Sequence, residues 1–129
     1  MKTANVAEAV KSEHAVALLK QMYGENRVEE NAARYQLVAD GFAKEFGDKA
    51  FEFFSAPGRT EIGGNHTDHN HGKVLAGSVH LDCVAAAAPN GTHTVNLISE
   101  TYNQHLVIDL DDLAPTEKTT GTEPLLKGI

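Results

Sequence analysis

The stretch Gly58–Gly72, GRTEIGGNHTDHNHG, lies between two segments that have the character of β-strands. The segment before it, AFEFFS, is short and aromatic, which predicts a strand over residues 50–55 that Pro57 and Gly58 end. The segment after it, KVLAGSVHLDCVAAAA, keeps a strand-like character up to the turn signal PNG at residues 89–91. The glycine-rich stretch is therefore expected to be the loop that joins two strands.

Two helices are expected before this loop. Apolar residues recur at helical spacing from Asn5 to Met22, and Gly24 is a plausible stop. A second periodic stretch covers residues 28–46, where Gly47 gives a C-terminal cap. The aromatic residues of this second stripe are interpreted as packing rather than as a cofactor site.

Two further strands and a short helix are expected after the loop. The segments THTVNLISE and QHLVIDL alternate apolar and polar residues, so they are predicted to pair antiparallel and to bury one face each. The residues expected on that face are Val95, Leu97, Leu106, Ile108 and Leu110. Residues 111–121 are polar and predict a surface connection. The tail TEPLLKGI carries a helix start with Thr122 as N-cap, and the chain stops after barely one turn.

Composition and charge restrict the setting. A chain of 129 residues with 41% apolar content predicts one globular domain, residues 1–129. The net charge of −7 argues against nucleic acid or an anionic membrane as partner, because both require clustered Lys and Arg. We expect a cytoplasmic protein, since no apolar run is long enough for a signal peptide or a spanning helix. Cys83 is expected to be a small buried apolar residue.

The histidines of the loop suggest a metal site as one hypothesis. His66, Asp68, His69 and His71 fall within six residues, and imidazole with carboxylate can bind zinc or iron. Metal sites usually draw ligands from separate elements, however, and a single loop does not supply these. The other candidates on strand-like segments are expected to face solvent: His80, His93 and His105. The favoured prediction is therefore a loop without a metal.

The same loop also has the groups that bind sugar hydroxyls. Its glycines allow positive φ values and a close approach of the backbone to a ligand. Hydrogen-bond donors and acceptors come in one short arc: Asn65, His66, Thr67 and Asp68. The carboxylate of Asp68 can accept bonds from two neighbouring hydroxyls, and Arg59 adds a permanent positive charge. A glycine-rich surface loop with no ligand is the remaining alternative.

The longer stretch APGRTEIGGNHTDHNHGKVLAGSV resembles the substrate-binding signature of galactokinases, G-R-x-N-[LI]-I-G-E-H-x-D-Y. These enzymes belong to a superfamily with homoserine, mevalonate and phosphomevalonate kinases. The matching positions are Gly58, Arg59, Gly64, His66 and Asp68. Similarity extends from MYGENRVEENAARYQLVADGF through LISE to EPLLKGI. Mevalonate kinases lack the aspartate at the position of Asp68, so this residue favours a sugar.

The resemblance implies a fold, a reaction and residue roles. The fold is α+β, with N-terminal helices packed on a mostly antiparallel sheet, as in the N-terminal, ribosomal protein S5 domain 2-like domain of the superfamily. The reaction of a full-length enzyme is the phosphorylation of galactose to galactose 1-phosphate, with ATP and Mg²⁺ as cofactors. Arg59 takes the catalytic role, stabilising charge on the transferred phosphoryl group. The residues implied to bind galactose or a related hexose are Asn65, His66, Thr67 and Asp68.

The sequence also departs from the family pattern. The replaced positions are Glu61 for asparagine, Gly63 for isoleucine, Asn65 for glutamate and His69 for tyrosine. The family's phosphate loop, P-x-x-x-G-[LI]-S-S-S-A, and the segment with the base aspartate have no counterpart here. We therefore expect the N-terminal portion of a longer enzyme, cut inside a helix, inactive alone, without bound cofactor and able to form homo-oligomers through exposed apolar surface. The alternatives are a non-catalytic galactose-sensing homologue and a His/Asp metal-binding protein.

Overall fold

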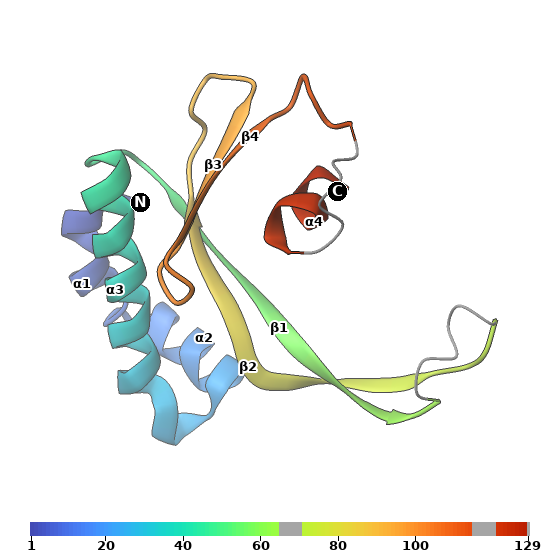
Figure 1. The fold of residues 1–129 in the computed structure, drawn as a ribbon. Helices are drawn as coiled ribbons and strands as arrows, with labels where there is room; N and C mark the ends of the chain where they lie inside the picture. Colours follow the sequence, from blue (N-terminus) through green and yellow to red (C-terminus); the bar gives the residue numbers. More distant parts are fainter. Residues whose placement is uncertain (65–70, 115–120, 129) are drawn as a thin grey trace. The chain divides into compact units, whose positions relative to one another are not determined.

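The computed structural model describes residues 1–64, 71–114 and 121–128 (Figure 1). The chain divides into two compact units, Met1–Ala88 and Pro89–Ile129. The first unit holds three α-helices and a long β-hairpin, and the second holds a short β-hairpin and one helix. The expected α+β class is therefore confirmed, with two small antiparallel sheets in place of one sheet. A single domain over residues 1–129 stays a prediction.

The helices of the first unit follow the predicted order but not every predicted boundary. They are η1 (Thr3–Asn5), α1 (Val6–Ala9), α2 (Glu13–Tyr23), η2 (Glu25–Arg27) and α3 (Val28–Phe46). The bounds of α3 agree with the prediction, and Gly47 follows it with a φ of 80°. A continuous helix from Asn5 to Met22 is wrong. The chain leaves the helical path before Ser12, whose Oγ accepts a bond from the Ala15 backbone N–H at 3.3 Å and starts α2.

The long hairpin consists of β1 (Glu52–Gly63) and β2 (Leu75–Ala87), which pair antiparallel. The prediction that the first strand ends at residue 55 is wrong, because β1 continues through Pro57 and Gly58. Proline is tolerated in a two-stranded sheet, where every strand is an edge strand. The irregularity appears as a register shift instead: Pro57 lies opposite Asp82, whereas Arg59 lies opposite Ser78. A register shift of this kind bends the strand that holds the extra residues.

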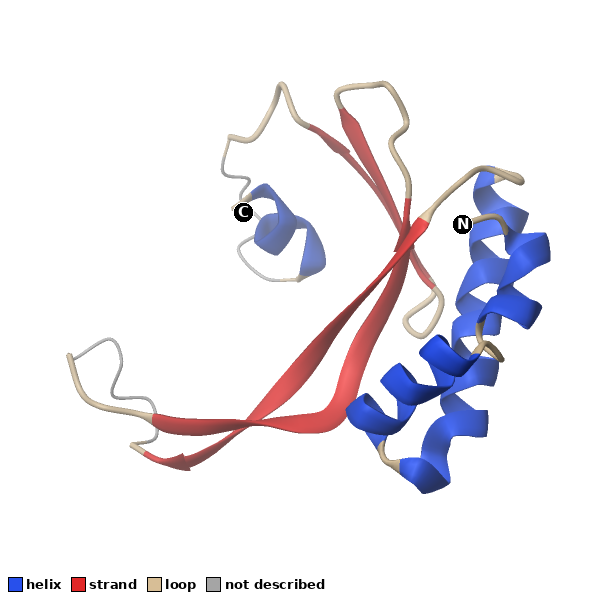
Figure 2. Ribbon diagram, turned by 180° about the vertical axis from the view of Figure 1, so that it is seen from behind, coloured by secondary structure: helices blue, strands red, loops and turns tan. Residues whose placement is uncertain are grey.

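The core of the first unit lies between the helices and the inner half of the hairpin. Figure 2 shows these helices on one side of the inner half of the hairpin, while the outer half, residues 59–64 and 71–78, extends beyond them. The buried cluster consists of Val6, Ala39, Phe42 and Phe51. The rings of Phe42 and Phe51 lie 4.8 Å apart between centroids, and those of Tyr35 and Phe53 lie 5.0 Å apart. The aromatic stripe of α3 therefore packs, as predicted.

The expectation that Cys83 is buried is wrong. Side chains alternate across a strand, and on β2 it is Asp82 and Val84 that lie on the partly covered face. Cys83 consequently lies on the face without helices and is exposed. Phe54 and Leu81, exposed by 55% and 71%, are also uncovered within this unit. The apolar run of β2 thus reflects two apolar faces, of which the helices cover one.

The second unit contains β3 (Thr94–Ser99), β4 (Gln104–Asp109) and α4 (Thr122–Lys127). The predicted antiparallel pairing of the strands is confirmed, with Leu97 opposite Leu106. Ile108 is buried, but Val95 and Leu110 of the expected apolar face are exposed. The N-cap position of α4 is Gly121, so the assignment of Thr122 as the cap is wrong. Among the described residues, no helix has the length and apolar character needed to cross a membrane.

Candidate functional site

The outer half of the long hairpin carries the candidate site residues that the structure describes. Arg59 lies on β1 rather than in a loop, because the strand continues past Pro57 and Gly58. Its side chain is 74% exposed, and its Nη2 lies 3.9 Å from Oε1 of Glu61 on the same strand. The guanidinium is therefore accessible to a ligand and only weakly neutralised. Outside the described residues lie Asn65, His66, Thr67, Asp68 and His69.

Gly64, directly after β1, lies close to the backbone of Lys73, which precedes β2. Its φ is 85°, and a Cβ atom there would lie 2.2 Å from the carbonyl oxygen of Lys73. No L-residue fits this backbone without movement of Lys73, so the position requires glycine. A Cβ atom at the neighbouring Gly63 would meet nothing within 4 Å. Glycine at position 64 thus allows the backbones of Gly64 and Lys73 to lie close together.

The metal hypothesis concerns residues that are mostly outside the described part. Within the described residues, no three His, Cys, Asp or Glu side chains gather into a possible metal site. His71 is exposed, and the other proposed ligands lie at positions 65–70. The three histidines expected to face solvent are exposed: His80 on β2, His93 just before β3, and His105 on β4. The metal-binding alternative and the expected absence of a metal both remain predictions.

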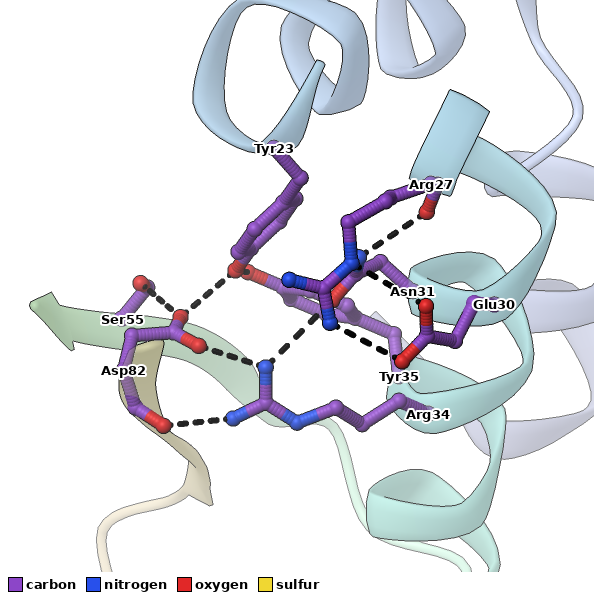
Figure 3. A network of polar contacts seen from close by, with 8 residues as sticks. All are labelled: Tyr23, Arg27, Glu30, Asn31, Arg34, Tyr35, Ser55 and Asp82. Atoms are coloured by element: carbon purple, nitrogen blue, oxygen red, sulfur yellow. Dashed lines mark hydrogen bonds and ion pairs between the residues drawn. The ribbon is translucent and has the colours of Figure 1, made fainter. Parts of the chain in front are cut away.

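A polar network that the sequence did not reveal connects the helices to the hairpin (Figure 3). Its centre is Asp82 on β2, whose side chain is only 2% exposed. The Asp82 carboxylate accepts hydrogen bonds from Tyr23 Oη, Ser55 Oγ and Arg34 Nη1, each at 2.5 Å. Arg34 Nη2 also donates to the backbone oxygen of Asp82 at 2.7 Å. Tyr23 and Tyr35 pair through their hydroxyl groups at 3.2 Å.

The network keeps Asp82 ionised. Burial by itself raises the pKa of Asp82, but the hydrogen bonds from Ser55, Tyr23 and Arg34 and the charge of Arg34 together hold this pKa below its usual value. Burial, followed by the hydrogen bond to Asp82, raises the pKa of Tyr23 well above its ordinary value. Tyr23 therefore acts as a neutral donor, and Arg34 supplies the positive charge that a buried carboxylate requires.

The lowered pKa of Asp82 predicts a stability that depends on acid pH. A group whose pKa is lower in the folded chain stabilises it above the unfolded pKa, here 3.8, and this contribution is lost as pH falls through the folded pKa. We expect the midpoint of urea unfolding to fall between pH 4 and pH 2 more steeply in the wild type than in Asp82→Asn. The comparison is made by circular dichroism, and parallel pH profiles for the two proteins would contradict the assignment.

One sequence feature could have indicated this network: an acidic residue at a position of β2 that faces the helices. Asp82 is the charged residue in the otherwise apolar run LDCVAAAA. The alternation of β2 places it on the helix-facing side, where a charge needs partners. Its partners come from positions 59, 48 and 27 residues away, and no local pattern marks them.

Comparisons with known proteins find similarity to galactokinases over part of the chain. Residues 40–89, which include the described strands β1 and β2, match a family model described as the galactokinase galactose-binding signature. The chain is 37% identical over 89 residues to a galactokinase of Lactococcus lactis subsp. cremoris, 67% of this chain and 22% of that enzyme. It is 36% identical over 95 residues to that of Lactococcus lactis subsp. lactis, 73% of this chain and 24% of that enzyme.

A galactokinase of Lacticaseibacillus casei gives a further match, 36% identical over 73 residues, 57% of this chain and 19% of that enzyme. The resemblance to the N-terminal portion of galactokinases is therefore confirmed over the matched part of the chain. The chain spans about a quarter of the length of the curated relatives that it matches. No solved structure matches it.

Proposed function

We propose that this chain is the galactose-binding part of a galactokinase, which as a complete enzyme phosphorylates galactose with ATP to give galactose 1-phosphate. The observation that carries the proposal is the match of residues 40–89 to the galactose-binding signature, whose described part contains the end of α3 and both strands of the long hairpin. The exposed guanidinium of Arg59 and the glycine-dependent approach at Gly64 support it, because both suit a strand pair that presents a ligand-binding segment.

The proposal assigns a role to each candidate residue. Arg59 stabilises the negative charge on the transferred phosphoryl group, where a fixed cation contributes most in the transition state. The side chains that bind the sugar hydroxyls are Asn65, His66, Thr67 and Asp68. An amide at Asn65 can both donate and accept, so it can replace the family glutamate as a hydroxyl partner. Glu61 lies 3.9 Å from the Arg59 guanidinium and neutralises it only weakly, so its positive charge stays available to a phosphoryl group.

The remaining parts of the proposal concern the complete enzyme. ATP and Mg²⁺ are its cofactors, and their phosphate loop and the base aspartate come from sequence other than these 129 residues. The chain alone is then inactive and binds galactose weakly. Its fold corresponds to the ribosomal protein S5 domain 2-like domain of the superfamily, and its location is the cytoplasm. Neither nucleic acid nor membrane is a partner of this acidic chain, and its uncovered apolar face around Phe54 and Leu81 supports self-association.

A comparison of two sugars tests the proposed function. The chain is expected to bind galactose more tightly than glucose, because Asp68 reads a pair of hydroxyls that includes the axial one. Asp68→Ala is expected to lose this preference, with a cost of about 1 to 3 kcal/mol in galactose affinity, since a sugar hydroxyl is left unpaired. Affinities are measured by ligand-observed NMR or calorimetry. Asp112→Ala, at an exposed aspartate of the second unit, is the control and should bind like the wild type.

Two results would contradict the proposal. A folded wild-type chain that responds equally to galactose and glucose contradicts the hydroxyl-reading role of Asp68. A folded chain that responds to neither sugar at millimolar concentration contradicts galactose binding by this chain.

A further inference from the structure

We propose that Asp82 is a positioning residue, which fixes the direction in which the outer half of the hairpin leaves the helices. The outer half consists of residues 59–63 of β1, Gly64, and residues 71–78, which lead into and begin β2. The inference rests on the proposed function in one respect: the outer half is taken to carry the sugar site. This role requires no contact between Asp82 and the sugar.

The position of Asp82 in the hairpin is the first argument. The pair Pro57 and Asp82 is the last regular pair before the register shift, and the next pair is Arg59 with Ser78. The β2 residues between these pairs, 79–81, are matched only by Gly58 on β1. Such an irregularity bends a strand, and Figure 1 shows β2 changing direction along its length. Asp82 therefore lies at the point where the bend begins.

The contacts of Asp82 are the second argument. Its side chain is held from three elements, by Tyr23 of α2, Arg34 of α3 and Ser55 of β1. Arg34 in addition donates to the backbone oxygen of Asp82 at 2.7 Å. A side-chain contact alone would leave the backbone able to turn, whereas this arrangement fixes side chain and backbone together (Figure 3). The direction of β2 at the start of the bend is thus tied to α3.

The close packing at the bend is the third argument. A Cβ atom at Gly58 would lie 3.2 Å from both the Leu81 carbonyl oxygen and Val79 Cγ2. The two strands are therefore in tight contact within the bend, so a change in direction of β2 is transmitted to β1 and to Arg59. Beyond the bend, the apolar side chains Ile62 and Leu75 are exposed by 69% and 62%. Packing against the helices does not hold them, and the orientation of the outer half depends on its attachment at Asp82.

The experiment compares Asp82→Asn with the control Glu30→Gln. Asparagine keeps the shape of Asp82 but directs an N–H₂ group at donors, and it removes the charge that pairs with Arg34. Exposed Glu30 of α3 pairs with Arg27 of η2 at 3.0 Å, so Glu30→Gln removes an ion pair whose two side chains, within the described part of the chain, do not hydrogen-bond to β1 or β2. Amide NMR spectra of both variants and the wild type are recorded with and without galactose.

For Asp82→Asn we expect shifted or broadened amide signals in the outer half, with the signals of Val6 and Phe42 in the core unchanged. Galactose affinity should fall about tenfold, because a misplaced binding segment loses aligned contacts. Glu30→Gln should leave both the outer-half signals and the affinity unchanged. A residue that only stabilised the fold would not alter the affinity of the folded population.

The outcomes separate this inference from the proposed function. Outer-half signals that shift while even the wild type fails to bind galactose support the positioning role and contradict the sugar site. Unchanged outer-half signals in folded Asp82→Asn overturn the positioning role. If Asp82→Asn does not fold, Ser55→Ala and Tyr23→Phe each remove one donor and keep the pair with Arg34. Smaller shifts in the same outer-half signals are expected for both, and their absence in both overturns the inference.

Discussion

Asp82→Ala is expected to lower the free energy of unfolding of the first unit by about 3 kcal/mol. The substitution removes a carboxylate that is 2% exposed and that accepts hydrogen bonds from Tyr23, Ser55 and Arg34 Nη1, while the bond from Arg34 Nη2 to the backbone oxygen can remain. Breaking one side of a buried pair costs this much because the remaining charge stays partly desolvated. Arg34 is partly exposed and can recover some hydration, which places the effect at the low end of the usual range.

Urea denaturation followed by far-ultraviolet circular dichroism measures this loss. The matched control is Glu30→Ala, which breaks the exposed ion pair with Arg27 and should leave the unfolding midpoint unchanged. Equal midpoints for Asp82→Ala and the wild type would show that the network does not stabilise the folded chain.

The second large effect is expected for Gly64→Ala. A left-handed backbone costs an L-residue about 1 to 2 kcal/mol, and the added Cβ would also lie 2.2 Å from the Lys73 carbonyl oxygen. The outer end of the hairpin must therefore open or shift. We expect the amide exchange rates of Leu75 to Ser78 to rise about tenfold or more, since each tenfold corresponds to about 1.4 kcal/mol of opening free energy. Under the proposed function, galactose affinity falls as well.

Gly63→Ala is the matched control for this prediction. The neighbouring glycine has no positive φ, and its Cβ would meet nothing within 4 Å. Hydrogen exchange measured by NMR should therefore give wild-type rates for Gly63→Ala. Similar rates for the two variants would mean that the close approach of Gly64 and Lys73 does not control the end of the hairpin.

Local patterns predicted much of the secondary structure. The apolar repeat and the glycine stop gave α3 its bounds, and alternation with a short turn gave the β3 and β4 pair. The break between α1 and α2 was not predicted, because the apolar helical repeat continues across Ser12. The capping bond of Ser12 requires a non-helical backbone at that residue, which the repeat does not reveal. The continuation of β1 through Pro57 was not predicted, because proline ends a strand only where its missing N–H would have to donate a hydrogen bond to a neighbouring strand.

For the candidate site, too, the sequence predicted one part and the structure was needed for the other. The resemblance to the galactokinase signature singled out Arg59 and Gly64 by type and spacing, and both fall within the residues 40–89 that match the galactose-binding family model. The strand position of Arg59, its contact with Glu61 and the approach of Gly64 to Lys73 required the paired hairpin. The roles of Asn65, His66, Thr67 and Asp68 stay predictions, because these residues lie outside the described part.

By itself the sequence determined the α+β class, the helix α3, the strand pairs of both hairpins and the resemblance to the galactokinase signature, because each follows from residues that are neighbours along the chain. Only the tertiary structure decided that Asp82 faces inward and Cys83 outward, since the covered face of β2 depends on where the helices pack. It likewise decided that Tyr23, Arg34 and Ser55 meet at one carboxylate. Buried charge requires partners, and the chain supplies them from distant positions that share no local pattern.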